Sequence, residues 1–204
     1  MVVRAHLIPS LLLLSIAMTV RSAHSAVMLP QNLEDLEAQS QLVFVGVCTS
    51  RTETRTERGL PVDVYTFEVR EAVKGLAAKD TVVVIRQLGA GRIDPGGLRH
   101  YVPELPTYRV GQELLLFLSP ASRLGLTSPV GFAQGAFEVT REDGKAPRIV
   151  LSPLRRRLLV QGIDRAKYAE DPAFTPEERS LLSELPGRAD LDVFCSVVRK
   201  MAQQ

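Results

Sequence analysis

The middle of the chain alternates between apolar and polar positions in a way that predicts β-strands. The segment 42–48 is apolar on both faces, which indicates a strand buried on both sides. Gly46 would allow that strand to bend or bulge. From 62 to 73, apolar and polar residues alternate with the period of two of a half-buried strand. Further strands are expected at 81–88, 113–118, 135–140 and 148–151.

Helical spacing replaces this alternation at the two ends of the folded segment. A short helix is expected within 31–41, ahead of the first strand. The segment 175–178 has the N-cap threonine, first-turn proline and capping-box glutamate of a helix start. Ser152 can cap a helix as well, and Asp190 is expected to cap the last helix, whose apolar stripe includes Cys195.

These elements together predict a mainly β fold. We expect a five- to six-stranded antiparallel OB-like barrel with C-terminal helices. A small β-sandwich is the alternative, because strand count alone does not separate the two. The expected organisation is a signal peptide at 1–25, an OB-like barrel domain at 26–151, and a helical C-terminal extension at 152–204 packed on the barrel.

The first 25 residues have the three parts of a secretory signal peptide. Arg4 supplies the positive charge, and residues 23–25 form a small-residue cleavage motif. The apolar stretch 7–20 is shorter than the roughly 20 residues that a membrane span needs. Cleavage after residue 25 or 26 predicts a secreted or periplasmic protein with no transmembrane segment. An uncleaved N-terminal anchor is the alternative.

Removing this leader changes the charge of the chain. The whole sequence has 25 basic and 23 acidic residues and three histidines. The leader holds Arg4, Arg21, His6 and His24 but no acidic residue, so the remaining chain is formally neutral and keeps only His100. A neutral chain with few aromatic residues gives no basis for nucleic-acid binding.

Candidate catalytic groups are sparse in the remaining chain. A nucleophilic site of the serine or cysteine type needs a histidine close to the nucleophile. His100 lies in a long loop at 89–111, where a solvated surface histidine is the usual interpretation. An unrecognised hydrolase at His100 is the alternative. No spacing fits a zinc motif or a phosphate loop, so we expect no enzyme, no cofactor and no metal site.

The two cysteines, Cys48 and Cys195, both lie outside the leader. In an exported protein such a pair predicts a disulfide. This bond would join the first strand to the last helix and would stabilise the fold by at most roughly 5 kcal/mol. Two separately buried thiols are the alternative.

Four stretches of the sequence resemble a group of exported bacterial proteins with the OB-like barrel of the tissue inhibitors of metalloproteinases and netrin-type modules. They are 42–47, 72–75, 110–118 and 131–139. The resemblance implies a barrel that meets a protease through its N-terminal segment and the loop 51–59. The animal inhibitors place an N-terminal cysteine on the protease zinc. The mature terminus expected here is Ala26-Val27, so that mechanism does not carry over.

The sequence therefore predicts an exported, non-catalytic binding module, and the resemblance implies inhibition of an exported metalloprotease. An envelope interaction or assembly protein is the alternative. The basic run 155–157 is expected to be a solvated helix face. The residues expected to contact a protein partner are Ala26, Val27, Arg51, Arg55, Arg58, Arg92, His100 and Tyr101.

Overall fold

The structure is a computed structural model of the chain. It describes residues 29–77, 81–89, 92–93, 96–97, 99–100, 102 and 104–204. The predicted signal peptide lies outside these residues, as do Ala26, Val27 and Tyr101. No helix within the described ranges combines the length and the apolar character that crossing a membrane requires.

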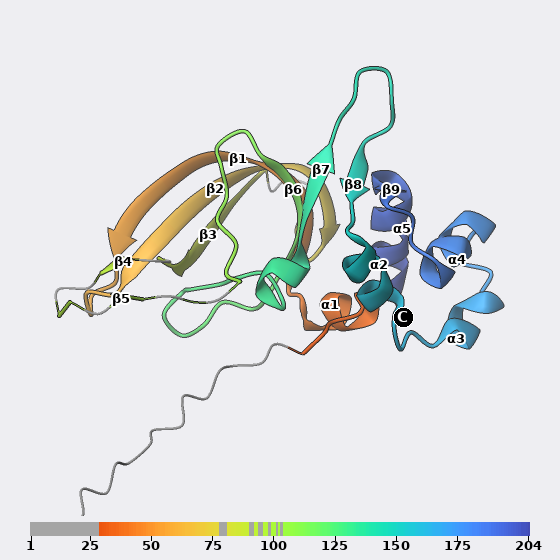
Figure 1. Cartoon of the computed structure of the whole chain (residues 1–204), viewed down its shortest axis with the longest axis horizontal. Helices are drawn as coiled ribbons and strands as arrows, with labels where there is room; N and C mark the ends of the chain where they lie inside the picture. The colour runs from red at the N-terminus through yellow and green to blue at the C-terminus, as the bar shows by residue number, and fades with distance from the viewer. Residues whose placement is uncertain are drawn as a thin grey trace, which may run out of the picture.

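Seven strands form one antiparallel sheet that is not closed, in the order β3-β2-β1-β6-β7-β8-β9 (Figure 1). Their bounds are β1 Leu42–Arg55, β2 Pro61–Lys74, β3 Val82–Leu88, β6 Glu113–Leu118, β7 Ala136–Thr140, β8 Arg148–Val150 and β9 Arg188–Asp190. A separate two-stranded ribbon pairs β4 (Arg92–Ile93) with β5 (Arg99–His100). The mainly β prediction is confirmed. The described strands do not form the two packed sheets of a β-sandwich.

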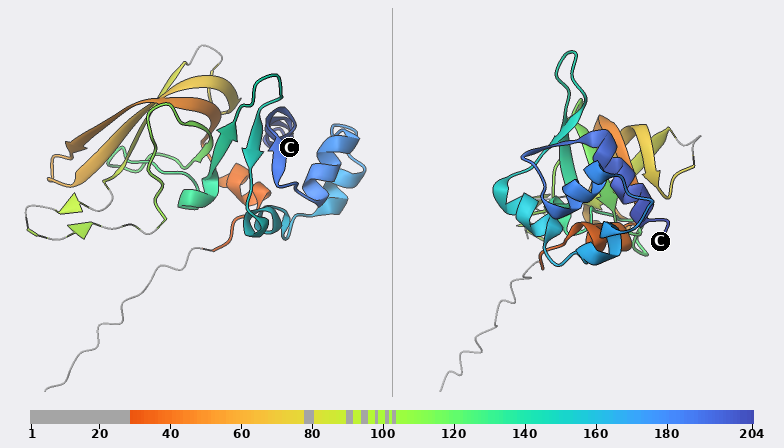
Figure 2. Two further views of the ribbon diagram at one scale, coloured as in Figure 1. Left: turned by 45° about the horizontal axis from the view of Figure 1, so that its top comes forward. Right: turned by 90° about the vertical axis from the view of Figure 1, so that its right-hand side faces the viewer.

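The helices gather at one end of the molecule, beside β6 to β9, while β1, β2 and β3 curl away from them (Figures 1 and 2). They are α1 Leu33–Gln39, η1 Phe132–Gly135, α2 Pro153–Val160, α3 Arg165–Ala169, α4 Pro176–Ser183 and α5 Leu191–Met201. The predicted caps are confirmed: the side chains of Ser152, Thr175 and Asp190 each accept a hydrogen bond from the first turn of their helix. The C-terminal part is not wholly helical, because β9 adds a strand to the sheet.

Strand β1 is longer than the predicted strand 42–48. It continues to Arg55, so most of the expected loop 51–59 is one arm of a hairpin with β2, and only 56–60 turns. Cross-strand pairing carries the hairpin past the apolar core, which is why apolar patterning alone underestimates its length. Register shifts interrupt the pairing at three places, one of them between Val45 and Gly46. The predicted bulge at this glycine is therefore confirmed. A Cβ at Gly46 would lie only 2.9 Å from the Phe44 ring, which explains why a glycine stands there.

The sheet separates two apolar cores. The helix-side core packs one face of the sheet against the helices, and includes Val43, Val45, Leu115, Phe117, Phe137, Leu181, Phe194 and Val198. The loop-side core fills the concave face of β1, β2, β3 and β6, and comprises Phe44, Cys48, Tyr65, Phe67, Val83, Ile85, Tyr108, Leu114, Leu116 and Leu118. Strands β1 and β6 contribute alternate residues to both cores, which confirms that the first strand is buried on both faces.

This separation overturns the predicted disulfide. Cys48 and Cys195 are both free and fully buried. Cys48 belongs to the loop-side core, whereas Cys195 on α5 belongs to the helix-side core. Since the period of two along β1 fixes the face on which Cys48 lies, the sheet stands between the two thiols. The structure therefore has the alternative arrangement of two separately buried thiols.

The basic run on α2 does not behave as a solvated helix face. Arg155 Nη2 donates to the carbonyl oxygens of Ala133, Gln134 and Ala136, at 2.6 to 2.8 Å. Its guanidinium also stacks on Phe137, with 4.2 Å from Cζ to the ring centroid. Burial lowers the pKa of Arg155 to about 10. This arginine is thus a structural link between α2 and the end of β6–β7, a role that its sequence neighbours did not indicate.

Candidate functional site

Arg51, one of the predicted partner-binding arginines, lies on β1 next to β2. Arg51 is 3.5 Å from both carboxylate oxygens of Asp63 on β2, and its guanidinium stands over the Tyr65 ring at 5.6 Å. Asp63 is fully buried, which is costly for a carboxylate unless a cation stays close to it. Arg51 therefore stabilises the hairpin. Its side chain is 39% exposed, so only part of it is available to a partner.

The other predicted contact residues do not share one surface. Arg55 Nη1 donates to Gly59 O within the β1–β2 turn, and Arg58 is exposed in the same turn. Leu29, close to the predicted terminus, lines a pocket together with Gln39 of α1, at the opposite end of β1. A 14-residue strand separates these places by on the order of 40 Å. Arg92 and His100 face each other in the β4–β5 ribbon.

A main-chain hydrogen bond links β3 to the segment that follows β6. The chain after β6 returns as an extended segment whose Pro129 forms a bridge with Leu118. In that segment Thr127 N donates to Arg86 O on β3, at 2.7 Å.

A pocket lined mainly by apolar residues opens beside this link, and we call it the loop-side pocket. Its volume is about 370 Å³. Its walls are Gln87, Leu88, Val102, Leu105, Ser119, Pro120, Ser122, Leu126, Thr127, Ser128 and Phe132. No charged residue is among them, so the pocket suits an apolar group with a few polar contacts at its rim.

Gln87 supplies the most unusual polar group of this pocket. It is 1% exposed, and its Nε2 donates to Pro106 O, whereas its Oε1 has no hydrogen-bond partner. A buried acceptor without a partner costs on the order of 1–3 kcal/mol. Such a group is retained most readily where a ligand supplies the missing donor.

Two buried tyrosines extend this pattern toward the Arg51 end. The Tyr108 hydroxyl is buried and makes no hydrogen bond, whereas the buried Tyr65 hydroxyl lies close to the main-chain N–H of Tyr108. Their rings pack edge to face, with 4.8 Å between the centroids. Burial raises the pKa of both hydroxyls, and burial likewise raises the pKa of the nearby Cys48 thiol. These groups stay protonated at neutral pH, so none of them is an activated nucleophile.

A second pocket of about 260 Å³ lies next to the loop-side pocket and shares Ser119, Ser128 and Phe132 with it. Gln134 holds the N-terminal segment here: its Oε1 accepts from Gln31 N at 2.8 Å, and its Nε2 donates to Leu29 O at 3.2 Å. Phe132 has a φ of +51°, in the left-handed region that bulky residues rarely adopt. Strained residues of this kind concentrate at binding sites.

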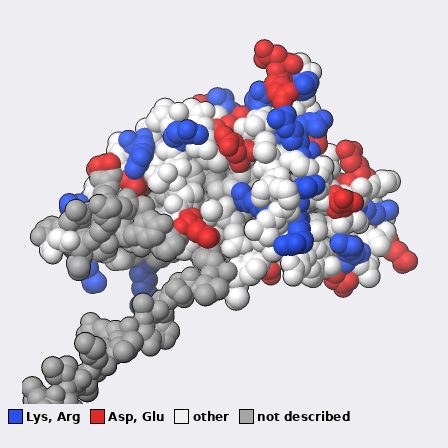
Figure 3. Space-filling view, in the orientation of Figure 1, with Lys and Arg blue, Asp and Glu red and all other residues white. Residues whose placement is uncertain are grey.

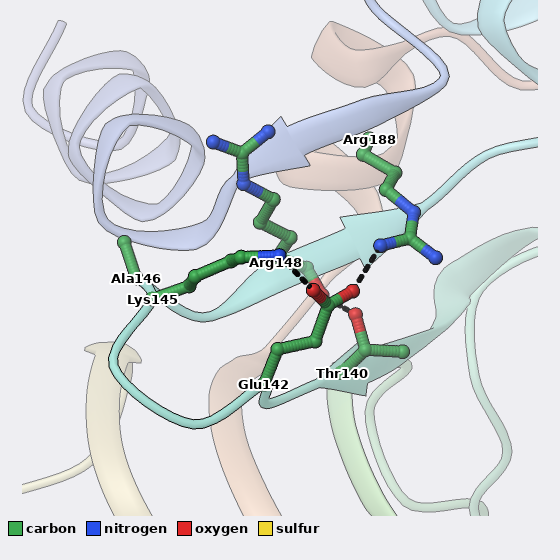
Figure 4. A pocket seen from close by; sticks show the side chains of 6 residues that line it. All are labelled: Thr140, Glu142, Lys145, Ala146, Arg148 and Arg188. Carbon is green, nitrogen blue, oxygen red and sulfur yellow. Dashed lines mark hydrogen bonds and ion pairs between the residues drawn. The ribbon is translucent and has the colours of Figure 1, made fainter.

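Another cluster of charged residues lies at the β7–β8 hairpin (Figure 4). Glu142 accepts a 2.6 Å hydrogen bond from Lys145 and forms an ion pair with Arg188 on β9, while the Arg148 guanidinium points away from it. The hydrogen bonds from Lys145 and Arg188 lower the pKa of Glu142. Figure 3 shows basic and acidic side chains side by side over this hairpin. The cluster is an internal ion-pair network that joins the hairpin to β9.

Within the described residues, no group of three or more His, Cys, Asp or Glu side chains could hold a metal ion. Comparison of the chain with models of known protein families, with curated proteins and with solved structures finds no match. The candidate site consequently stands on its own geometry. It combines an apolar pocket, a buried acceptor without a partner and a strained phenylalanine at one side of the concave face.

Sequence patterning did not indicate the loop-side pocket, because its walls come from segments up to 45 residues apart. The one local signal is Gln87. It follows Val83 and Ile85 at the spacing of two that places all three side chains on the buried face of β3. An amide at such a position is unusual for a core strand.

Proposed function

We propose that this protein is an exported, non-catalytic module that binds a protein partner, and that an apolar side chain of the partner enters the loop-side pocket. The observation that carries the proposal is the lining of that pocket, which is largely apolar and has no charged side chain among its described residues. Gln87 is the buried amide of this lining, fixed by its hydrogen bond to Pro106 O. The volume of about 370 Å³ is near the lower end of the range for ligand pockets, about 300–1,000 Å³, and suits one or two side chains.

We further propose that the curled part of the sheet is an OB-like barrel with one weakly closed seam. The long, bent β1 pairs with β2 on one side and β6 on the other, as the first strand of such a barrel does. The seam is the contact of Thr127 with Arg86. In this view the loop-side pocket is the mouth of the barrel, where folds of this kind bind their ligands.

Inhibition of an exported metalloprotease remains the activity that we propose for this module. The N-terminal segment supports it, because Gln134 fixes Leu29 and Gln31 beside the pocket. We propose that residues 26–27, which precede this segment in the sequence, contact the bound partner. The hairpin turn at Arg55 and Arg58 lies at the far end of β1, so we assign the contact to the terminus and the pocket.

The test is inhibition of a panel of secreted zinc proteases by the purified protein. We expect at least one protease to be inhibited, and we expect Leu126→Glu, which places a carboxylate in the pocket wall, to weaken inhibition by about 100-fold. Leu124→Glu is the matched control. Leu124 is 47% exposed in the same loop and does not line the pocket, so this variant should inhibit normally.

Unchanged activity across the panel would reject the inhibitor assignment. The broader binding role has its own test, photo-crosslinking from position 126 in the native exported fraction, with position 124 as the control. We expect one protein to be captured from position 126 and not from position 124. Equal capture from both positions, or capture from neither, would contradict binding at the pocket.

A further inference from the structure

The outer edge of β3 is a second surface, on the other side of the Thr127 contact from the loop-side pocket. In an antiparallel pair, alternate residues bond to the neighbouring strand and the others point their N–H and C=O groups away from it. Gly89 N donates to Pro61 O and Val69 N donates to Thr81 O, and the β2–β3 register between them has no shift. Positions 83, 85 and 87 therefore bond to β2, and positions 82, 84 and 86 point outward.

Arg86 shows that this edge accepts a main-chain partner. Its outward carbonyl receives the hydrogen bond from Thr127 N. The segment that carries Thr127 turns away at once, since Ser122 N donates to Leu126 O. No main-chain hydrogen bond of the described residues reaches the outward groups of Val82 and Val84.

The same two valines expose their side chains, 56% for Val82 and 53% for Val84. Val83 and Ile85 are buried in the loop-side core, and they alternate with Val82 and Val84 along β3. The two exposed valines therefore lie on the opposite face of the sheet. Natural edge strands usually block pairing with a charged residue, a proline or a bulge. The run 82–85 is Val-Val-Val-Ile and has none of these.

We propose that the edge at 82–85 binds one extended strand of a partner protein, which continues the sheet beyond β3. The occupant is a polypeptide backbone because the chain's own Thr127 segment already pairs with this edge at Arg86, and an incoming strand would extend that pairing along β3. Its outward side chains would be apolar or β-branched, to cover Val82 and Val84. This inference does not rest on the loop-side pocket and holds whether or not the pocket is occupied.

The test uses amide hydrogen exchange of the full protein, read at Val82 and Val84. The probe is a soluble eight-residue peptide with valine at alternate positions and threonine between them. We expect the peptide to slow exchange of these two amides by at least about tenfold. Two control peptides have the same sequence, and each carries N-methyl groups on one of the two alternating sets of residues, so that each lacks the N–H donors of one edge. The peptide methylated on the set that faces β3 should give no protection.

Variants of the edge sharpen the test. Val84→Pro removes an N–H that the sheet does not use, so an edge strand tolerates it, and it should abolish protection of Val82 by the peptide. Val84→Thr keeps the N–H and the β-branched shape, and should retain that protection. If Val84→Pro lowers the unfolding midpoint, Val84→Lys replaces it, because an edge lysine opposes strand addition without a backbone change.

Three results would overturn the proposal. The first is no protection of Val82 and Val84 at saturating peptide. The second is equal protection by the unmodified peptide and both methylated forms, which would show that backbone pairing is not involved. The third is protection without peptide that rises with protein concentration, because the edge would then belong to a second copy of this chain.

Discussion

Buried polar groups on the two faces of the sheet differ in how fully they are hydrogen-bonded. On the helix side, Glu178 accepts hydrogen bonds from Thr175 N, Ser196 Oγ and Lys200 Nζ. On the loop side, the Tyr108 hydroxyl makes no hydrogen bond and Gln87 Oε1 accepts none. The helix side has two unpartnered Nε atoms, in Arg156 and Arg179, but each of these guanidinium groups donates to a carbonyl oxygen through another nitrogen.

This difference indicates that the helix-side core mainly stabilises the fold, whereas the loop-side core is shaped by function. A core whose polar groups are satisfied contributes stability, whereas buried groups without partners lower stability and persist where a function needs them. The helix-side core also draws on α1, α4, α5 and β9 together, so its elements should unfold as one unit. The loop-side core is bordered by Tyr108, by the hydrogen bond of Gln87 to Pro106 and by that of Thr127 to Arg86, all from loop segments, and should open locally.

The largest effect is expected from removing an aromatic ring on the helix side. Phe194 is fully buried on α5, with 5.7 Å between its ring centroid and that of Phe137. Phe194→Ala should lower the free energy of unfolding by about 3–5 kcal/mol, because rigid elements on all sides prevent the cavity from collapsing. Chemical denaturation measures this loss.

Phe67→Ala is the matched change on the loop side. Phe67 is equally buried, and its ring packs against Tyr108 at 5.3 Å. Since the Tyr108 loop can settle into the space, we expect a smaller loss than for Phe194→Ala, by at least about 1 kcal/mol. Equal losses for the two variants would contradict the difference between the cores.

The next effect concerns the pH dependence of the helix-side network. Burial alone would raise the pKa of Glu178, but the hydrogen bonds from Lys200, Ser196 and Thr175 N outweigh it and lower the pKa to about 2. A carboxyl group with a lowered pKa in the folded state stabilises the fold fully above its unfolded pKa near 4.5. That contribution, on the order of 3 kcal/mol, is lost as the pH falls from 4.5 toward 2.

Glu178→Gln tests this contribution. The variant should be less stable than the wild type at neutral pH, and the difference between them should shrink steadily as the pH falls below 4.5. Thermal unfolding across this pH range measures it. A difference that stays constant with pH would assign the loss to packing alone. Glu142→Gln is the control, because Glu142 is exposed to solvent and should contribute little at any pH.

Local sequence signals were sufficient where an element is specified by its own residues. The strand predicted at 113–118 has the bounds of β6, and Thr175 and Asp190 cap the helices that they were expected to cap. Elements that depend on distant partners were missed. Strand β9 is only Arg188–Asp190, without a β pattern, and it forms because the turn after α4 places it against β8.

The candidate site shows the same limit more strongly. The predicted contact residues were the N-terminal pair 26–27 and a set of mostly basic loop residues, and the structure brings Arg51 to Asp63. The loop-side pocket arises only when β3 meets the returning segment at Thr127. Such a meeting depends on the curvature of the sheet, which periodicity does not specify.

The two free thiols report on how each core opens. Thiol titration of the unfolded, unreduced protein should find both Cys48 and Cys195 free. In the folded protein, a thiol reagent followed by mass spectrometry should modify Cys48 at least about tenfold faster than Cys195, because local opening exposes the loop-side core. Equal rates, limited by global unfolding at both positions, would contradict local opening.

The smallest effect tests the polar groups directly. Tyr108→Phe removes a buried hydroxyl that makes no hydrogen bond, so the free energy of unfolding should stay within about 1 kcal/mol of the wild type or rise. Tyr168→Phe is the matched change on the helix side. The Tyr168 hydroxyl donates to Glu34 Oε1 at 2.5 Å, and its removal should cost about 1–2 kcal/mol. If Tyr108→Phe cost as much as Tyr168→Phe, the Tyr108 hydroxyl would have a partner in solution, and the two cores would no longer differ in how they satisfy their polar groups.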